Sequence, residues 1–99
     1  MNTEPISSFR EPTAEQAALR RRIWGQMFGD LIRNIRESLG LTVAEAAERS
    51  GLQQSEWMAI EEGCVPHDAE RLSAIAGTLE LNWHFIVEIA VFCRDAWDC

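Results

Sequence analysis

Side chains that could bind a metal occur in the middle of the chain. Cys64 and His67 have the C-x-x-H spacing of a metal-binding pair, and His84, Cys93 and Cys99 are the side chains that could complete a site. Zinc sites normally combine two such ligand pairs, and the sequence contains only one. Cys93 also lies in an apolar stretch, and Cys99 is more typical of a free thiol than of a nucleophile. We therefore expect no metal and no cofactor.

Catalytic chemistry has even less support. The sequence has no glycine-rich phosphate loop, no Ser/His/Asp spacing and only two histidines, both of which are explained as surface residues. Covalent catalysis requires a nucleophile that an adjacent base activates, and the sequence shows no such pair. The sequence therefore predicts that the protein is not an enzyme.

Acidic side chains dominate the stretch between residues 42 and 63. The stretch contains five carboxylates and one cation, namely Glu45, Glu48, Glu56, Glu61, Glu62 and Arg49. Nonspecific affinity for DNA comes mainly from cations that release the counterions of the duplex. This part of the chain therefore disfavours sequence-blind DNA binding.

Arg20, Arg21 and Arg22, with Arg10 upstream, form the only basic cluster of the sequence. They could bind phosphate, or enter a minor groove as basic arms do. Because successive residues of a helix point about 100° apart, all three cannot face one DNA strand. A solvated helix face and pairing with acidic side chains of a partner chain are the alternatives.

The bulk composition is that of one small globular domain. The chain has 99 residues, 46% of them hydrophobic, and a net charge of −7, which disfavours nonspecific binding to nucleic acid or to an anionic membrane. No apolar run approaches the roughly 20 residues of a membrane span, and the first residues lack the apolar core of a signal peptide. The three cysteines are an odd number without disulfide-framework spacing, which is most simply explained by a reducing cytoplasm.

Helical periodicity divides the chain into three parts. Residues 1–12 are polar and aperiodic, and we expect a flexible N-terminal arm there. A helical extension is expected over residues 13–28, and a helical domain over residues 29–99. The later helices are predicted over about 43–49, 53–62, 68–79 and 82–97.

Two glycines interrupt the first part of this pattern. Thr13 with Gln16 fits a capping box, so a helix is expected to begin there. Gly25 and Gly29 each cost about 1 kcal/mol inside a helix. We therefore expect two helices, or one kinked helix with its break near Gly29.

The last predicted helix is apolar on nearly all sides, which is typical of a helix buried on more than one side. In a chain of this size, a second copy is the simplest cover for the second side. The predicted dimer interface consists of Trp83, Ile86, Ile89, Ala90, Cys93 and Trp97. Trp24, Met27 and Phe28 could join this helix in a dimer core, or form a ligand pocket or a partner groove.

Four residues stand at the fixed offsets of a helix-turn-helix motif: Ala47, Gly51, Leu52 and Ile60. Ala47 is small where two helices would cross, and Gly51 suits a turn that other residues adopt only with strain. With the residues around them, from about 28 to 86, they resemble the lambda-repressor/Cro-like (XRE) helix-turn-helix family. The resemblance implies an all-α fold, a five-helix lambda-repressor-like domain with an extra N-terminal helix.

The resemblance also implies roles for individual residues. Arg36 and Glu61 match a pair that bridges the first and third helices of the family, which is a structural role. Gln54 and Ser55 match the first residues of the recognition helix, which read base edges in the major groove. The remaining candidates for DNA contact are Gln53, Arg49, Arg20, Arg21 and Arg22.

Other positions depart from the pattern of the family. Val43 stands where the family often has a glutamine, and Trp57 replaces a smaller branched residue. Trp57 is expected in the core, where its size could displace the recognition helix. Outward positions that often carry basic or amide side chains in relatives are here Glu56, Met58, Ala59 and Glu62.

Two functions follow from these observations. The first is a homodimeric transcription regulator that binds double-stranded DNA through an unusually acidic recognition surface. The second is a protein that has kept the fold, has lost DNA binding and acts on another regulatory protein, as an antiactivator, antirepressor or accessory subunit. The motif and the Gln54-Ser55 pair favour the first function, and the acidic face favours the second.

Overall fold

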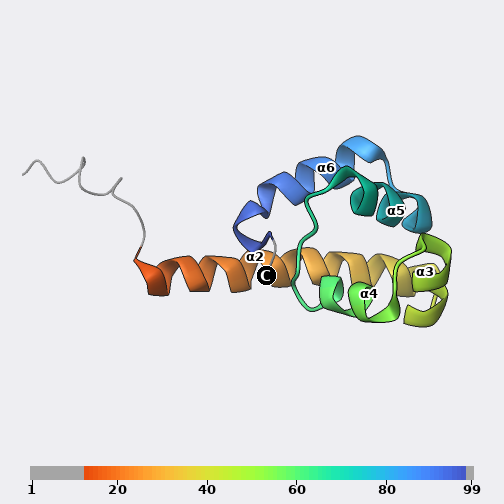
Figure 1. The fold of residues 1–99 in the computed structure, drawn as a ribbon, viewed down its shortest axis with the longest axis horizontal. Coiled ribbons are helices and arrows are strands. Elements are labelled where there is room, and N and C mark those ends of the chain that lie inside the picture. The colour runs from red at the N-terminus through yellow and green to blue at the C-terminus, as the bar shows by residue number, and fades with distance from the viewer. Residues whose placement is uncertain (1–12, 98–99) are drawn as a thin grey trace, which may run out of the picture.

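Helices account for most of residues 13–97, the part of the chain that the structure, a computed structural model, describes (Figure 1). They are α2 (Ala14–Ser38), α3 (Val43–Ser50), α4 (Gln54–Glu61), α5 (Ala69–Leu79) and α6 (Trp83–Phe92), followed by the short 3-10 helix η1 (Arg94–Ala96). The described residues include no strand, and the one isolated bridge joins Val65 and Trp97. The predicted all-α fold is confirmed. The flexible arm expected over residues 1–12, and Cys99, lie outside the described residues.

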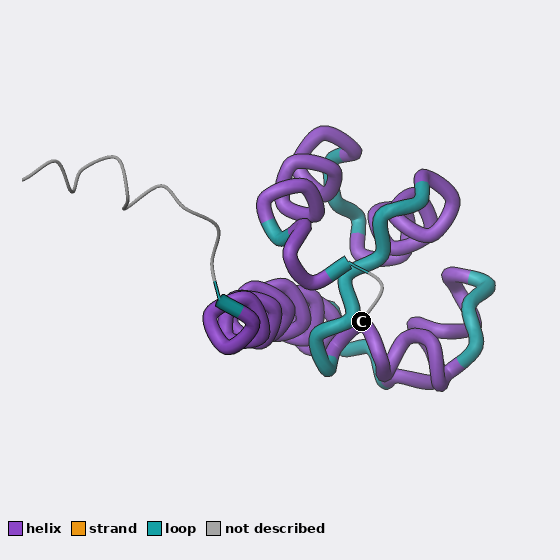
Figure 2. Tube along the Cα trace, turned by 60° about the vertical axis from the view of Figure 1, so that its left-hand side comes forward, coloured by secondary structure: helices purple, strands orange, loops and turns teal. Residues whose placement is uncertain are grey.

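The structure has one helix where the glycines predict two helices or one kinked helix. α2 has 25 residues, a length of about 37 Å, and continues through Gly29 without a break. Its start is a capping box, because the Thr13 hydroxyl accepts from the Gln16 N–H at 3.1 Å and the Gln16 side chain accepts from the Thr13 N–H at 2.9 Å. The first half of α2 projects beyond the other helices in Figure 1. In Figure 2, where α2 is seen partly end-on, those helices lie to one side of it.

Gly25 and Gly29 mark a close contact between backbones. A Cβ atom at Gly25 would lie 2.4 Å from the Gly63 carbonyl oxygen, and one at Gly29 would lie 2.3 Å from the Glu61 carbonyl oxygen. Since Cβ atoms do not approach an oxygen so closely, only glycine lets α2 pack against the end of α4 in this way. The two glycines therefore serve the packing of α4, which offsets their unfavourable helix propensity.

Replacing Gly29 with alanine should destabilise the protein. Gly29→Ala should lower the free energy of unfolding by about 1–3 kcal/mol, because the added methyl group overpacks the contact with α4. Urea unfolding followed by circular dichroism measures this change. Gly77→Ala is the matched control, because Gly77 lies in α5 and nothing beyond its own stretch of helix is within 4 Å of its Cβ position. There the substitution should stabilise by up to about 1 kcal/mol, and equal effects at the two sites would contradict the packing role.

The hydrophobic core lies between α2 and the four later helices. Each helix contributes side chains from one face, as expected for amphipathic helices around a common core. The largest side chains that are at most 2% exposed are Phe28, Ile32, Trp57, Ile60, Ile75, Leu79 and Ile86. Trp57 therefore lies inside the core.

The last helix is shorter than the sequence predicts. α6 ends at Phe92 instead of about Trp97, and η1 follows it. The chain turns there because its end packs back on the domain. The Ala96 carbonyl accepts from the Val65 N–H at 3.2 Å, and the Trp97 indole donates to the Ala90 carbonyl at 2.9 Å. These bonds satisfy backbone groups that a longer α6 would carry away from the core.

Half of the predicted dimer interface lies inside the single chain. Ile86, Ala90 and Cys93 are at most 1% exposed, so they cannot contact a second copy. Ile89 and Trp97 are half-buried, and Trp83 is 42% exposed. One side of α6 packs inside the domain, and its most exposed apolar side chains are Trp83, Phe85, Val91 and Phe92. Of these four, Trp83 belongs to the predicted interface.

An ion pair joins α2 to α4 inside the protein. Arg36 donates from Nε to Oε2 of Glu61 at 2.6 Å and from Nη2 to Oε1 at 3.1 Å, and the two residues are 8% and 6% exposed. The Trp57 indole also donates to Glu61, at 2.6 Å, and Arg36 Nη1 donates to the Leu41 carbonyl at 2.7 Å. The hydrogen bond to Glu61 raises the pKa of Arg36, and outweighs burial, which lowers it. The bidentate pair expected between these residues is formed.

Removing one member of this pair should lower the free energy of unfolding much more than removing an exposed cation. Arg36→Met should lower the free energy of unfolding by about 3–5 kcal/mol, because the Glu61 carboxylate stays buried without its cation. Arg33→Met serves as the comparison, since the Arg33 side chain is 40% exposed and its ion pairs should contribute at most about 1 kcal/mol. Urea unfolding gives both values. Similar losses in the two variants would show that the buried pair does not hold α4.

Candidate nucleic-acid interface

α3, the turn after it and α4 have the arrangement of a helix-turn-helix. The Thr42 hydroxyl caps α3 by accepting from the Glu45 N–H at 3.1 Å. α3 ends at Gly51, whose φ of 78° lies in the left-handed region and whose N–H donates to the Ala47 carbonyl at 3.0 Å. This conformation is open to glycine at little cost. It turns the chain within a few residues, so that α4 packs across the buried Ala46 and Ala47.

The exposed face of α4 begins with the two predicted base readers. Gln54 and Ser55 are exposed in the first turn, and Gln53 before them is exposed as well. Met58, at 47%, and Glu62 continue the exposed face toward the other end of the helix. An amide and a hydroxyl therefore stand at the N-terminal end of α4, where hydrogen bonds to base edges are chemically possible.

Carboxylates occupy the N-terminal ends of both helices of the motif. Glu45 accepts from the Thr42 N–H at 2.9 Å, and Glu56 accepts from the Gln53 N–H at 3.0 Å. Hydrogen bonds from the backbone and the hydroxyl of Thr42 lower the pKa of Glu45, so this side chain is charged at neutral pH. Free helix N-termini attract phosphate through their unpaired N–H groups and their positive dipole ends. Here the protein's own carboxylates already use these positions.

Cations near the motif are few, and several already have acidic partners. Arg49 is exposed in the last turn of α3. Arg33, which is not among the predicted contacts, lies beside α4 and is shared between Asp30 at 3.1 Å and the Glu61 carbonyl at 3.1 Å. Its sequence signal is its place one turn before Arg36 on the same side of α2. Among the predicted DNA contacts, Arg49 is the cation that lies within the motif itself.

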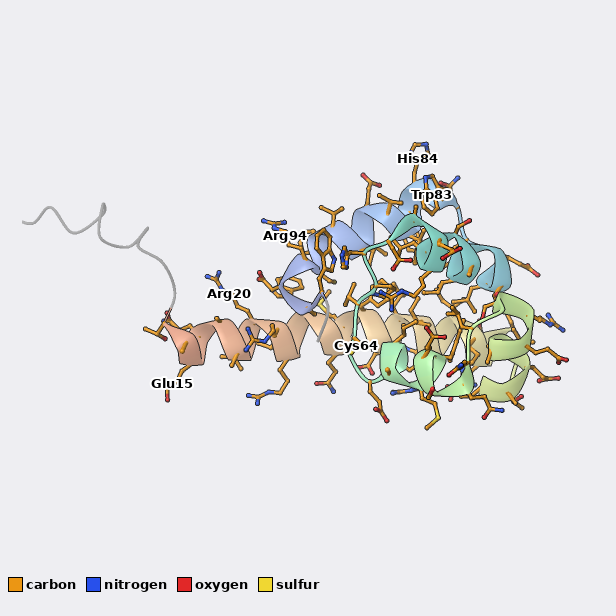
Figure 3. All side chains as sticks on the ribbon, in the orientation of Figure 1. Glu15, Arg20, Cys64, Trp83, His84 and Arg94 are labelled. Atoms are coloured by element: carbon orange, nitrogen blue, oxygen red, sulfur yellow. The ribbon has the colours of Figure 1, made fainter. Side chains whose placement is uncertain are left out.

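The three consecutive arginines do not act on one surface. Arg21 and Arg22 line a groove between α2 and the C-terminal end of α4, which also contains Glu62. Arg20 lines a different groove with Arg94, the first residue of η1. Figure 3 labels Arg20 and Arg94 and shows Arg20 on the projecting half of α2. The cluster is therefore divided, and its members lie away from Gln54 and Ser55, which stand at the opposite end of α4.

Two of the residues considered as metal ligands, Cys93 and His67, are engaged in packing. Cys93 is 1% exposed, and burial raises the pKa of its thiol. The His67 ring stacks on Trp97, with ring centroids 5.0 Å apart. Within residues 13–97, no three His, Cys, Asp or Glu side chains are grouped as a metal site would require.

Membrane insertion through a helix also has no support in the described part of the chain, where no helix combines the length and the apolar character of a membrane span.

Comparison with known proteins places this motif in a family. A family model described as a helix-turn-helix domain matches residues 27–82, more than half of the chain. The match begins in the middle of α2 and ends before α6, so it includes α3, α4 and the turn between them. No curated protein sequence and no solved structure matches the chain significantly. Helix-turn-helix domains are in general DNA-binding parts of regulators. The chain belongs to the helix-turn-helix domain family.

Proposed function

We propose that the protein is a transcription regulator of the XRE helix-turn-helix type, which binds DNA in the cytoplasm as a homodimer. The observation that carries the proposal is the exposed Gln54-Ser55 pair at the N-terminal end of α4, on a helix fixed to the core by the Arg36–Glu61 pair. With α4 in the major groove, Gln54 can form two hydrogen bonds with an adenine, and Ser55 can bond to several bases.

Phosphate contacts in this proposal are few. Gln53 and Arg49 are exposed beside the reading end of α4 and would contact the DNA backbone. Each phosphate that a cation neutralises contributes about 0.9 to the slope of log affinity against log salt, and of these two side chains Arg49 is the cation. We therefore expect weak binding per protomer with a shallow salt dependence. Base contacts then supply a larger share of the affinity than in a basic helix-turn-helix protein.

A homodimer would double these contacts. Two α4 helices related by a twofold axis would enter successive major grooves about 34–36 Å apart. The expected operator is an inverted repeat, because each half-site meets the same residues of one protomer.

Base reading by Gln54 is tested with duplexes selected from a randomised library. The protein should enrich an inverted repeat, and Gln54→Ala should weaken binding to the enriched duplex by about 1–3 kcal/mol and relax the preference at one base pair of each half-site. Fluorescence anisotropy measures the affinity. Ser73→Ala, at an exposed position of α5, is the control and should bind as the wild type does. Failure to enrich any sequence at low salt would refute the proposal.

A second function is favoured by one specific observation. The Glu45 and Glu56 carboxylates sit on the two helix ends that would face phosphate. A surface of this kind suits a basic patch of another protein, because opposite charges steer association. The chain would then act as an antiactivator, antirepressor or accessory subunit, with the acidic face of α4 as its contact.

Charge reversal at Glu62 separates the two functions. If the protein binds DNA, Glu62→Lys should strengthen binding, because it removes a repulsive charge and adds a cation beside the duplex. If it binds a basic partner, the same change should weaken capture of that partner. Anisotropy with the enriched duplex and with random duplex measures the first effect.

The matched control is Glu80→Lys, the same charge change at the exposed end of α5 outside the motif. An equal gain in DNA affinity for both variants would mean that net charge, and not the face of α4, controls binding.

A further inference from the structure

The projecting half of α2 carries an apolar stripe. Leu19, Ile23 and Met27 follow one another at four-residue spacing, so they lie along one side of the helix. Their side chains are 47%, 49% and 54% exposed. The helix around them is exposed over residues 18–23. A row of exposed apolar side chains on a helix that projects from the domain is typical of a contact surface.

An apolar groove begins where this stripe ends. It lies between α2 and α6 and is lined by Met27 and Leu31 on one side and by Phe85, Ile89 and Phe92 on the other. Phe85 and Phe92 are 41% and 64% exposed, so the groove is open to solvent. Phe92 also packs edge-to-face on Trp24, with ring centroids 4.9 Å apart, which fixes the end of α6 against α2.

The stripe and the groove have matching lengths. Leu19 to Met27 spans about 12 Å along the helix, and the α2 side of the groove, from Met27 to Asn34, spans about 10 Å. Met27 belongs to both surfaces. An isologous contact requires that one patch be complementary to itself under a twofold rotation. A stripe and a groove that adjoin at Met27 meet this requirement when the α2 helices of two protomers cross near Met27 in antiparallel directions. The stripe of each protomer then faces the groove of the other.

We infer that a second copy of this chain covers the groove, with the Leu19–Ile23–Met27 stripe of each protomer in the groove of the other. This contact deepens the proposed function, because it identifies the surface through which the proposed regulator would dimerise. It differs from an interface through Ile86, Ala90 and Cys93, which are buried within one chain.

Charge supports the same occupant. The part of α2 that carries the stripe has three cations, Arg20, Arg21 and Arg22, and one carboxylate, Glu15. The charged residues that line the groove are both acidic, Asp30 and Glu88. In the antiparallel arrangement, the basic part of one protomer lies beside the acidic groove of its partner. Of the three arginines, Arg20 lines the groove that contains Trp24 and Phe92, so this arrangement gives Arg20 a role that the exposed end of α4 does not offer.

Sedimentation velocity of the full-length chain without DNA tests the contact. The wild type should form dimers, and Ile23→Asp should raise the dimer dissociation constant at least about 100-fold, because a twofold interface loses the contact twice. Circular dichroism and urea unfolding would show that the variant remains folded. Met58→Asp introduces the same charge at an apolar side chain of similar exposure on α4, and it should leave the dimer intact.

A charge exchange tests the orientation. Arg20→Glu and Glu88→Arg should each weaken the dimer, and the double variant should recover most of the loss, since the two side chains would face each other across the interface.

Three results would overturn the inference: a monomeric wild type at about 100 µM, a dimer that survives Ile23→Asp, or equal dissociation by Ile23→Asp and Met58→Asp. A monomer would leave another part of the chain or another protein as the occupant. Because no DNA is present, this result would leave the base-reading proposal standing. An intact dimer that enriches no duplex would refute base reading alone.

Discussion

Glu61 connects more of the domain than any other polar side chain described above. Its carboxylate accepts from Arg36 and from the Trp57 indole, and its carbonyl accepts from Arg33 at the place where α2 comes closest, at Gly29. A buried carboxylate is stable only with its donors in place. The register of α4 along α2 is therefore fixed at one end by charge and by backbone contact. Consequently Glu61 belongs to the core, and the acidic surface of the motif consists of the other four glutamates.

The glutamates that stabilise the N-terminal ends of α3 and α4 also weaken the attraction of these helices for DNA. Glu45 and Glu56 accept from the N–H groups of Thr42 and Gln53, the residues that directly precede α3 and α4. Each such cap stabilises its helix by an amount of order 1 kcal/mol. A phosphate at either position would have to displace a charged side chain that already satisfies those donors. Glu45 and Glu56 therefore stabilise the motif but oppose the binding of phosphate to it.

Local signals made much of the fold predictable. Caps at Thr13, Thr42 and Asp68, and the turn at Gly51, depend on residues within a few positions, so the sequence predicts them well. Local signals do not show that α2 continues as one helix through Gly29, because the reason for that glycine lies 32 residues away, at Glu61. The burial of Ile86 within one chain was missed for a related reason. Periodicity shows that a helix is apolar on all sides, but it does not distinguish contact with the same chain from contact with another copy.

The candidate site was less predictable because its properties depend on pairing between distant groups. The sequence identifies Gln54 and Ser55 as polar residues at a helix start. Whether Glu56 folds back on the cap, and which groove each arginine lines, are three-dimensional facts. In the homodimer that we propose, the motif of one protomer has too few cations to hold DNA alone, and two linked motifs gain affinity from their effective concentration. The projecting half of α2 precedes the family match, which begins at residue 27. By forming the dimer, it would compensate for the DNA affinity that the acidic motif loses.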